Sequence, residues 1–161
     1  MCGSINSMLG VLRAGDVLVS FSFGELTNLF IEGKYKHAAM YVGNGKVVEA
    51  VGQGVHALDF EEFCASKDKI AILRSVFCTQ ETCKIAAMNV VSQIGKPYDY
   101  YFELSEKSFY CAELITWAYF NATIGLSPFT KRETMGVQTV LPIDFYNAKA
   151  KFEIVMERPT T

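Results

Sequence analysis

Two apolar, partly β-branched runs flank a short glycine-rich segment, and this feature constrains the fold most. The runs are HAAMYV (37–42) and KVVEAV (46–51), and only Gly43, Asn44 and Gly45 separate them. So short a connection, rich in glycine and asparagine, is typical of a β-hairpin, because these residues readily adopt positive φ angles. We therefore expect two adjacent antiparallel strands in the first third of the chain.

The register of this hairpin decides which side chains share a face. A three-residue loop, with its last glycine left-handed, pairs Val42 with Lys46 and Ala39 with Glu49. Glu49 then lies diagonal to His37 on the same face, with about 7 Å or less between their Cβ atoms. A loop made of only the last two of these residues would shift the register by one and place Glu49 on the other face. We expect the three-residue loop.

Outside the hairpin, hydrophobic periodicity and turn residues predict further elements. Strands are expected at 15–21, 55–58, 69–76 and 151–158, and helices at 24–33, from Asp59 onward, and at 79–94, 109–121 and 142–148. The polar, irregular stretch 124–139 is expected to be a surface loop, with a flexible lid as the alternative. We find no internal repeat or linker, so the pattern predicts one α+β domain over residues 1–161, with an antiparallel sheet.

Composition limits the partners that this chain is expected to bind. Half of its 161 residues are apolar, which is enough for a sizeable core. Fifteen Lys and Arg against 17 Asp and Glu give a net charge of -2, so nucleic acid is not an expected partner. No apolar run approaches the about 20 residues that span a bilayer, and the first residues lack a signal-peptide pattern. We expect a cytoplasmic protein without a transmembrane segment, and its oligomeric state stays open.

The five cysteines do not follow the spacing of a disulfide framework or of a zinc site. They lie at positions 2, 64, 78, 83 and 111, and the chain has only two histidines as further metal ligands. We therefore expect reduced thiols, no metal and no organic cofactor.

Cys111 and His37 are the candidates for chemistry. Cys111 lies near the start of the predicted helix 109–121, where the helix dipole favours a thiolate, and a nearby imidazole could take its proton. Glu49, in the expected register, would orient that imidazole. A buried cysteine at the head of an apolar helix is more often a packing residue, so the residues alone leave a structural role open. His56 has no acidic partner in the expected register and is interpreted as a polar surface residue.

The motif HAAMYVGNGKVVEA, with YCAEL far downstream, carries a further inference. GDVLV precedes the histidine, GKPYDYYF precedes the cysteine, and LPIDFYNAKAKFEIV lies near the end. This order resembles the circularly permuted branch of the NlpC-type papain-like superfamily, with YiiX-like amidases as the nearest match. In that branch a polar residue twelve positions after the histidine completes the triad, a spacing that His37 and Glu49 have. The resemblance implies a permuted papain-like fold in which an antiparallel sheet packs against the cysteine-bearing helix.

The resemblance also implies an activity and a site. It implies a cysteine hydrolase that cleaves the amide bond of a peptide or an amino-acid amide through an acyl-enzyme. Cys111 would be the nucleophile, His37 the general base and then the acid, and Glu49 the orienting residue. The backbone N–H of Cys111 would hold the oxyanion, unless Ser108 caps the helix through it, and Tyr98 is one candidate for a second donor.

Tyr98 and Tyr110 flank the nucleophile in the family's motif and are the expected substrate-binding residues, although covering the core is equally compatible with the aromatic cluster around them. Three other functions stay open: hydrolysis or transfer of a lipid-derived acyl ester or thioester, a non-catalytic binding module, and a reversibly oxidised regulatory thiol. The expected partner is accordingly a small molecule, a peptide or a lipid-derived substrate.

Overall fold

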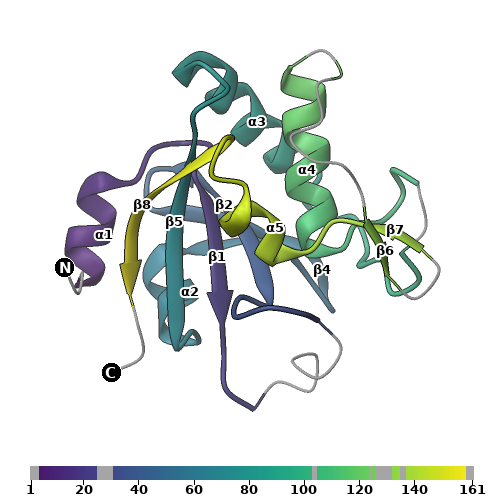
Figure 1. Ribbon diagram of the computed structural model, residues 1–161, viewed down its shortest axis with the longest axis horizontal. Coiled ribbons are helices and arrows are strands. Elements are labelled where there is room, and N and C mark those ends of the chain that lie inside the picture. The colour runs from purple at the N-terminus through teal and green to yellow at the C-terminus, as the bar shows by residue number, and fades with distance from the viewer. Residues whose placement is uncertain are drawn as a thin grey trace.

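A six-stranded sheet forms the centre of the molecule (Figure 1). The computed structural model describes residues 4–24, 31–102, 105–123, 125, 132–134 and 137–158. The strands lie in the order β4-β3-β2-β1-β5-β8, and each neighbouring pair is antiparallel, as expected. Their bounds are β1 Val17–Phe21, β2 His37–Gly43, β3 Lys46–Val51, β4 Gly54–Asp59, β5 Lys69–Ser75 and β8 Phe152–Arg158.

Helices cover both faces of this sheet. They are α1 Ile5–Val11, α2 Phe60–Ala65, α3 Gln80–Ser92, α4 Cys111–Ala122 and α5 Pro142–Asn147. Figure 1 shows α3 and α4 side by side, with α1 on the side of β8. Thr79 starts α3 because its hydroxyl accepts from the N–H of Thr82 at 3.1 Å. None of the described helices is long and apolar enough to cross a membrane.

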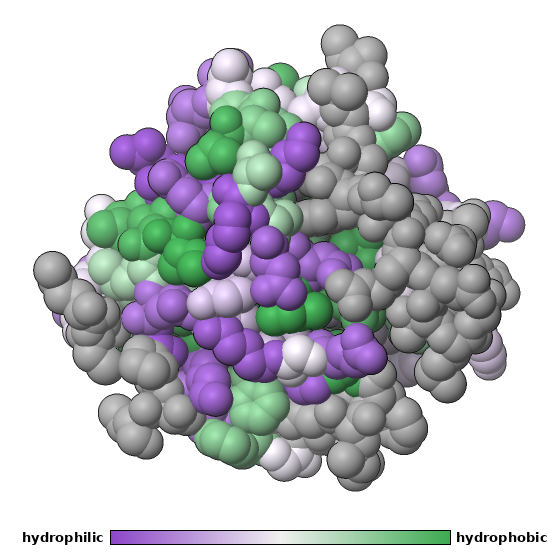
Figure 2. All heavy atoms as spheres, viewed as in Figure 1, coloured by the Kyte–Doolittle hydropathy of each residue, from purple (hydrophilic) through white to green (hydrophobic). Residues whose placement is uncertain are grey.

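The buried side chains form two clusters, one on each face of the sheet. Val17 and Val19 pack with α3, α4 and α5, whereas Leu18, between them, packs with α1 and α2. Successive strand residues point to opposite faces, so a strand covered on both sides is apolar throughout. Figure 2 shows the molecular surface from the same direction as Figure 1. Hydrophilic residues cover much of the described part of this surface, and a group of hydrophobic residues lies on the side where Figure 1 places α1 and β8.

The β2–β3 hairpin has the predicted pair of Ala39 and Glu49 but not the predicted loop. Gly43, rather than Val42, pairs with Lys46, so the connection is a two-residue turn, and Val42 is an extra residue that forms a β-bulge. The expected three-residue loop is therefore wrong. Because the bulge shifts the register back by one residue, Glu49 keeps the face that the longer loop would have given it.

Three other sequence expectations differ from the structure or fall outside it. The stretch 124–139 contains a short antiparallel pair, β6 Arg132–Thr134 with β7 Val137–Thr139, so its description as a loop is wrong there. Helix α1 was not expected, and α4 begins at Cys111, two residues later than predicted. The helix expected at 24–33 falls largely on residues 25–30, which lie outside the described residues.

Candidate active site

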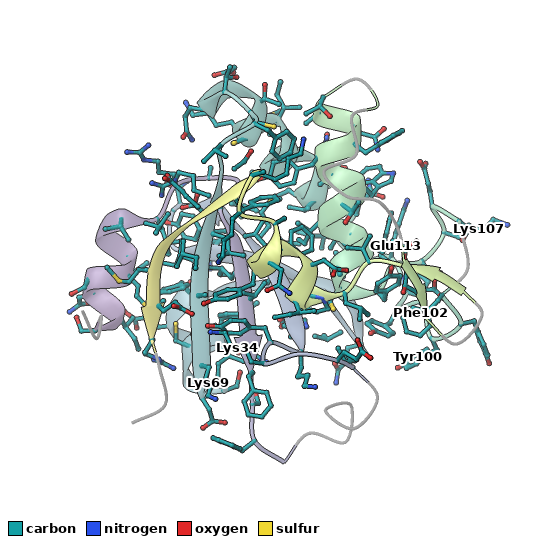
Figure 3. The ribbon with its side chains drawn as sticks, in the orientation of Figure 1. Lys34, Lys69, Tyr100, Phe102, Lys107 and Glu113 are labelled. Atoms are coloured by element: carbon teal, nitrogen blue, oxygen red, sulfur yellow. The ribbon has the colours of Figure 1, made fainter. Side chains whose placement is uncertain are left out.

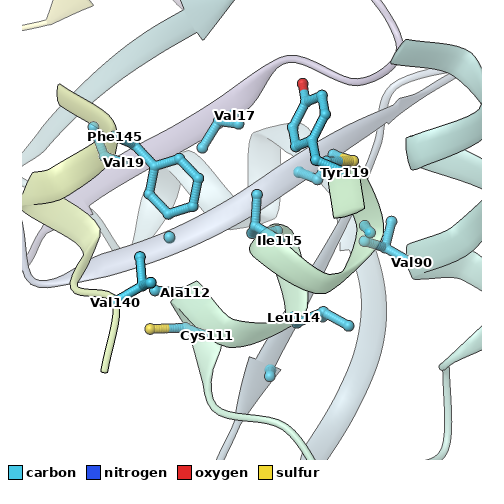
Figure 4. Close-up of a cluster of buried hydrophobic side chains, with 14 of the residues drawn as sticks. Val17, Val19, Val90, Cys111, Ala112, Leu114, Ile115, Tyr119, Val140 and Phe145 are labelled. Carbon is cyan, nitrogen blue, oxygen red and sulfur yellow. The ribbon is translucent and has the colours of Figure 1, made fainter. Parts of the chain in front are cut away.

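Cys111 is the first residue of α4. Its side chain is buried, with 5% of the residue exposed, at the edge of the cluster that Figure 4 shows around Ala112 and Ile115. Tyr110, not Ser108, is the N-cap residue, and the Tyr110 N–H donates to Glu113 Oε2 at 3.2 Å. The first N–H groups of a helix have no intrahelical acceptor. The thiol of Cys111 therefore lies at the positive end of the helix dipole, beside N–H groups that can bind an anion.

His37, the first residue of β2, lies where the two buried clusters meet. Its Nε2–H donates to Glu49 Oε2 at 2.6 Å, and Cys111 lies close enough to raise the pKa of the ring. The ring centroid is 6.4 Å from that of Phe63, which belongs to the cluster around α2, whereas Cys111 belongs to the cluster around α4. The structure thus brings together the three residues expected to form a triad, although 74 positions separate His37 from Cys111.

His37 and Glu49 each shift the pKa of the other toward its charged form. Burial alone lowers the pKa of His37, but the hydrogen bonds and charges of Cys111 and Glu49 outweigh it and raise that pKa from 6.5 to about 9. Burial alone raises the pKa of Glu49, but the hydrogen bonds from His37 and His56 and the charge of His37 lower it from 4.5 to about 2. Near neutral pH, Glu49 is therefore a carboxylate and His37 is a charged imidazolium whose Nε2–H is bound to Glu49.

His56 corrects the sequence interpretation. It was expected to be a surface residue without an acidic partner, yet its Nε2 lies 2.9 Å from Glu49 Oε1. The two residues are direct partners in the β3–β4 pair, and the His56 side chain is 44% exposed. A signal was present in the sequence, because a two-residue turn of Gly52 and Gln53 pairs Val51 with Gly54 and so places Glu49 opposite His56.

Tyr98 and Tyr110, the expected substrate-binding residues, both lie by the start of α4: Tyr110 immediately precedes Cys111, and Tyr98 pairs with Phe109. Tyr98 forms a bridge with Phe109, whose N–H donates to Pro97 O at 3.2 Å. Burial raises the pKa of Tyr98, and the nearby Cys111 adds to this shift. The hydroxyl of Tyr110 accepts the N–H of Val140 at 3.0 Å, so it anchors the chain that leads into α5.

Two further aromatic residues extend this region to the surface. The rings of Tyr100 and Tyr98 are 4.9 Å apart, and those of Phe102 and Tyr110 are 4.8 Å apart. Tyr100 is 64% exposed and Phe102 is 37% exposed. Figure 3 shows both on the side of the molecule where β6 and β7 lie, near the start of α4 and Glu113. An apolar part of a substrate could contact these rings next to the thiol.

A solved structure has a similar fold. It is the crystal structure of the YiiX metalloprotein from Escherichia coli O157:H7, which matches with a TM-score of 0.75 and 21% sequence identity. The match covers 91% of this chain and 98% of that one. At this identity the likeness bears on the fold, and it confirms the expected permuted papain-like α+β architecture.

The described residues of this chain do not fit a metal ion. His37 and His56 both direct Nε2 to oxygens of Glu49 rather than toward a common point. Within the described ranges, no group of three or more His, Cys, Asp or Glu side chains is arranged to hold a metal. We therefore derive no step of the chemistry through a metal.

The family model for the permuted papain-like amidase enzymes, the YaeF/YiiX or C92 family, matches residues 11–155. This range includes the hairpin, helix α4 and nearly all of the sheet. No curated protein matches the chain. Because the match spans most of the sequence and agrees with the fold, the chain belongs to the C92 family of permuted papain-like amidases.

Proposed function

We propose that this amidase-family protein hydrolyses the amide bond of a peptide or an amino-acid amide through an acyl-enzyme on Cys111. One observation carries the proposal: His37 Nε2 is bonded to the buried carboxylate of Glu49 at 2.6 Å, and Cys111 lies close enough to the same ring to raise its pKa. A thiol, an imidazole and an orienting acceptor in this order are what nucleophilic catalysis by cysteine requires.

The hydrogen bond to Glu49 assigns a role to each nitrogen of His37. An ionised carboxylate only accepts, so Nε2 carries the hydrogen that Glu49 binds. Nδ1 is then the nitrogen that receives the proton of Cys111, and the raised pKa of His37, about 9, keeps that proton on the ring near neutral pH. The thiolate attacks the carbonyl carbon, and the tetrahedral intermediate breaks down as His37 protonates the leaving amine. A water molecule, deprotonated by His37, then attacks the thioester and releases the acid and the thiol.

The oxyanion of the tetrahedral intermediate would lie against the start of α4. The N–H of Cys111 points there, because first-turn N–H groups have no intrahelical acceptor. The hydroxyl of Tyr98 is the candidate for a second donor. Burial raises the pKa of Tyr98, so its hydroxyl keeps its proton near neutral pH and can donate it in a hydrogen bond.

The family supports an amide as the scissile group, and the exposed rings of Tyr100 and Phe102 support an apolar or aromatic side chain near it. The same rings would also suit an acyl chain. Hydrolysis of a lipid-derived ester or thioester is therefore the second candidate. Both use the same residues, and they differ in the group that leaves.

A matched substrate series tests the proposal. The same acyl group is offered as an amide, an ester and a thioester to the wild type, to Cys111→Ala and to His37→Ala, and intact-protein mass spectrometry follows the acyl group. We expect turnover of the amide and a transient acyl adduct on Cys111 that both variants lack. Turnover of the ester or thioester alone would support the second candidate. The absence of any adduct in the wild type, with all three proteins folded, would favour a non-catalytic binding module.

A further inference from the structure

Glu49 binds a second histidine besides the one expected from the sequence. Its Oε2 accepts from His37 Nε2 at 2.6 Å, and its Oε1 accepts from His56 Nε2 at 2.9 Å. The Glu49 side chain is only 8% exposed. Each oxygen of this buried carboxylate is thus bound by one imidazole.

We propose that His56 is a positioning residue, which fixes the rotation of the Glu49 carboxylate and thereby the orientation of His37 toward Cys111. The inference rests on the proposed function for the role of His37, and it adds a fourth residue to the site. His56 itself lies on the far side of Glu49 and acts through it.

The reason for this role is the freedom of a glutamate side chain. Its last torsion has a broad minimum, so one hydrogen bond to Oε2 does not fix the plane of the carboxylate. A buried, charged oxygen without a partner is also costly, and the carboxylate of Glu49 would turn away from His37 to find one. The N–H of His56 removes both problems, because it binds the oxygen that His37 leaves open.

The backbone holds His56 in place for this contact. His56 lies directly opposite Glu49 in the antiparallel β3–β4 pair, where side chains are within reach of each other. The preceding strand residue, Val55, makes two hydrogen bonds to the chain after α3. Its N–H donates to Lys96 O at 2.8 Å, and its carbonyl accepts from Gly95 N–H at 2.9 Å. Strand β4 is thereby held by β3 along one edge and by the chain after α3 along the other, next to His56.

The donor, rather than the charge, is what this role requires. Glu49 only accepts, so His56 can serve through Nε2–H in its neutral or its charged form. A glutamine places its amide nitrogen the same number of bonds from Cβ as Nε2, whereas an asparagine is one bond too short. His56→Gln should therefore preserve the contact, and His56→Leu and His56→Asn should break it. Ala57→Gln, at the exposed neighbouring position, is the matched control.

Two readouts separate positioning from stability. The chain has only two histidines, so the imidazole signals of a ¹⁵N-histidine-labelled protein can be assigned with the His56 variants alone. The first readout is the rate at which the His37 Nε2 proton exchanges with water, and the second is the rate of Cys111 alkylation by iodoacetamide. We expect the Leu and Asn variants to exchange this proton about tenfold faster and to alkylate about tenfold more slowly than the wild type. The Gln variant and the Ala57 control should match the wild type, and thermal unfolding shows that each protein is folded.

The proposal is overturned if both rates are unchanged in the Leu and Asn variants, or if the Gln variant is impaired as much as they are. Failure of the proposed function looks different. If wild-type Cys111 proves inert, the catalytic role of His37 is lost. The exchange rate of the His37 Nε2 proton still shows whether His56 keeps the Glu49 carboxylate hydrogen-bonded to His37.

Discussion

Glu49→Gln is the substitution that tests the electrostatics of the site most closely. It keeps the size and shape of the side chain and removes the charge that lies 2.6 Å from His37 Nε2. Glutamine can still accept the Nε2–H through its amide oxygen, so the ring need not move. The two proteins therefore differ in the charge and in the contact with His56, because the amide nitrogen of the glutamine replaces the oxygen that accepts from His56 Nε2.

The expected size of the effect follows from the pKa of His37. Its rise from 6.5 to about 9 is a gain of about 3 kcal/mol for the charged imidazole. Hydrogen bonds and charges from Cys111 and Glu49 share this gain and work against burial. If Glu49 supplies about half or more of it, the pKa of His37 should fall by about one to two pH units in Glu49→Gln. The alkylation rate of Cys111 near neutral pH should fall by about tenfold or more, because the thiolate loses a charged partner.

The assay is an NMR titration of the two histidines, with His56→Gln to assign them. A pKa of His37 that stays near 9 in Glu49→Gln would show that the carboxylate does not hold its charge, and would refute this reasoning. The same variant should remove a pH dependence of stability. The pKa of Glu49 is lowered, so its contribution is present above pH 4.5 and is lost as the pH falls toward about 2. The pKa of His37 is raised, so its contribution is present below pH 6.5 and is lost as the pH rises through about 9.

Together, the two groups stabilise the folded state fully between about pH 4.5 and 6.5. Urea unfolding of the wild type as a function of pH should show this maximum, and Glu49→Gln should flatten it. A wild-type profile with no such maximum, or one that Glu49→Gln leaves unaltered, would contradict the coupling of the pair.

Two further predictions concern the stability of the structure around strand β1, and urea unfolding checks both. Arg74→Met should lower the free energy of unfolding by about 3–5 kcal/mol, because the carboxylate of Asp16, 2% exposed, accepts from Arg74 Nε at 2.9 Å and from Nη2 at 2.7 Å. Adding Asp16→Asn should recover part of the loss, and full additivity of the two losses would argue against a pair. Gly15→Ala should cost about 1–3 kcal/mol or more, since its φ is +94° and a Cβ would lie 2.5 Å from Cys83 O. Gly10 lies in α1, and a Cβ added there would meet no neighbouring atom within 4 Å, so Gly10→Ala should instead raise the free energy of unfolding by about 0.5–1 kcal/mol. Equal effects of Gly15→Ala and Gly10→Ala would refute this contrast.

Much of the sheet could be predicted from the sequence because the relevant information is local. The predicted pair of Ala39 and Glu49 is present, although a two-residue turn and a bulge produce it rather than the expected three-residue loop. The alternation of apolar residues did not predict the bulge at Val42. The residue next to the bulge, Tyr41, makes one contact within the hairpin and one with α2. The hydroxyl of Tyr41 accepts the N–H of Gly45 at 2.9 Å, and the Tyr41 ring packs edge-on against Phe60, with 6.4 Å between centroids. Such contacts with α2 are not visible in the hairpin sequence.

The site itself could be predicted only in part. The spacing of His37 and Glu49 is a property of one hairpin, but the meeting of His37 and Cys111 depends on the packing of α4 against β2 and β3. No local pattern contains that contact, so the family resemblance supplied it. His56 was missed because the strand was expected to begin at Val55, whereas it begins at Gly54, and this one-residue difference places His56 opposite Glu49. Helix α1 was missed because it is short, and Ser4, whose hydroxyl accepts from Ser7 N–H at 3.2 Å, is its main sequence signal.

The rate of alkylation at each cysteine, in the wild type and in His37→Ala, tests the central claim most directly. Burial raises the pKa of both Cys64 and Cys83 to about 11 and also raises that of Cys78, so these thiols should react slowly near neutral pH. Peptide mass spectrometry should show that Cys111 reacts faster than these three, although only 5% of it is exposed, and that His37→Ala removes this advantage. If Cys111 reacts as slowly as the other buried thiols in the wild type, or if His37→Ala leaves its rate unchanged, His37 does not activate it and the acyl-enzyme mechanism is wrong.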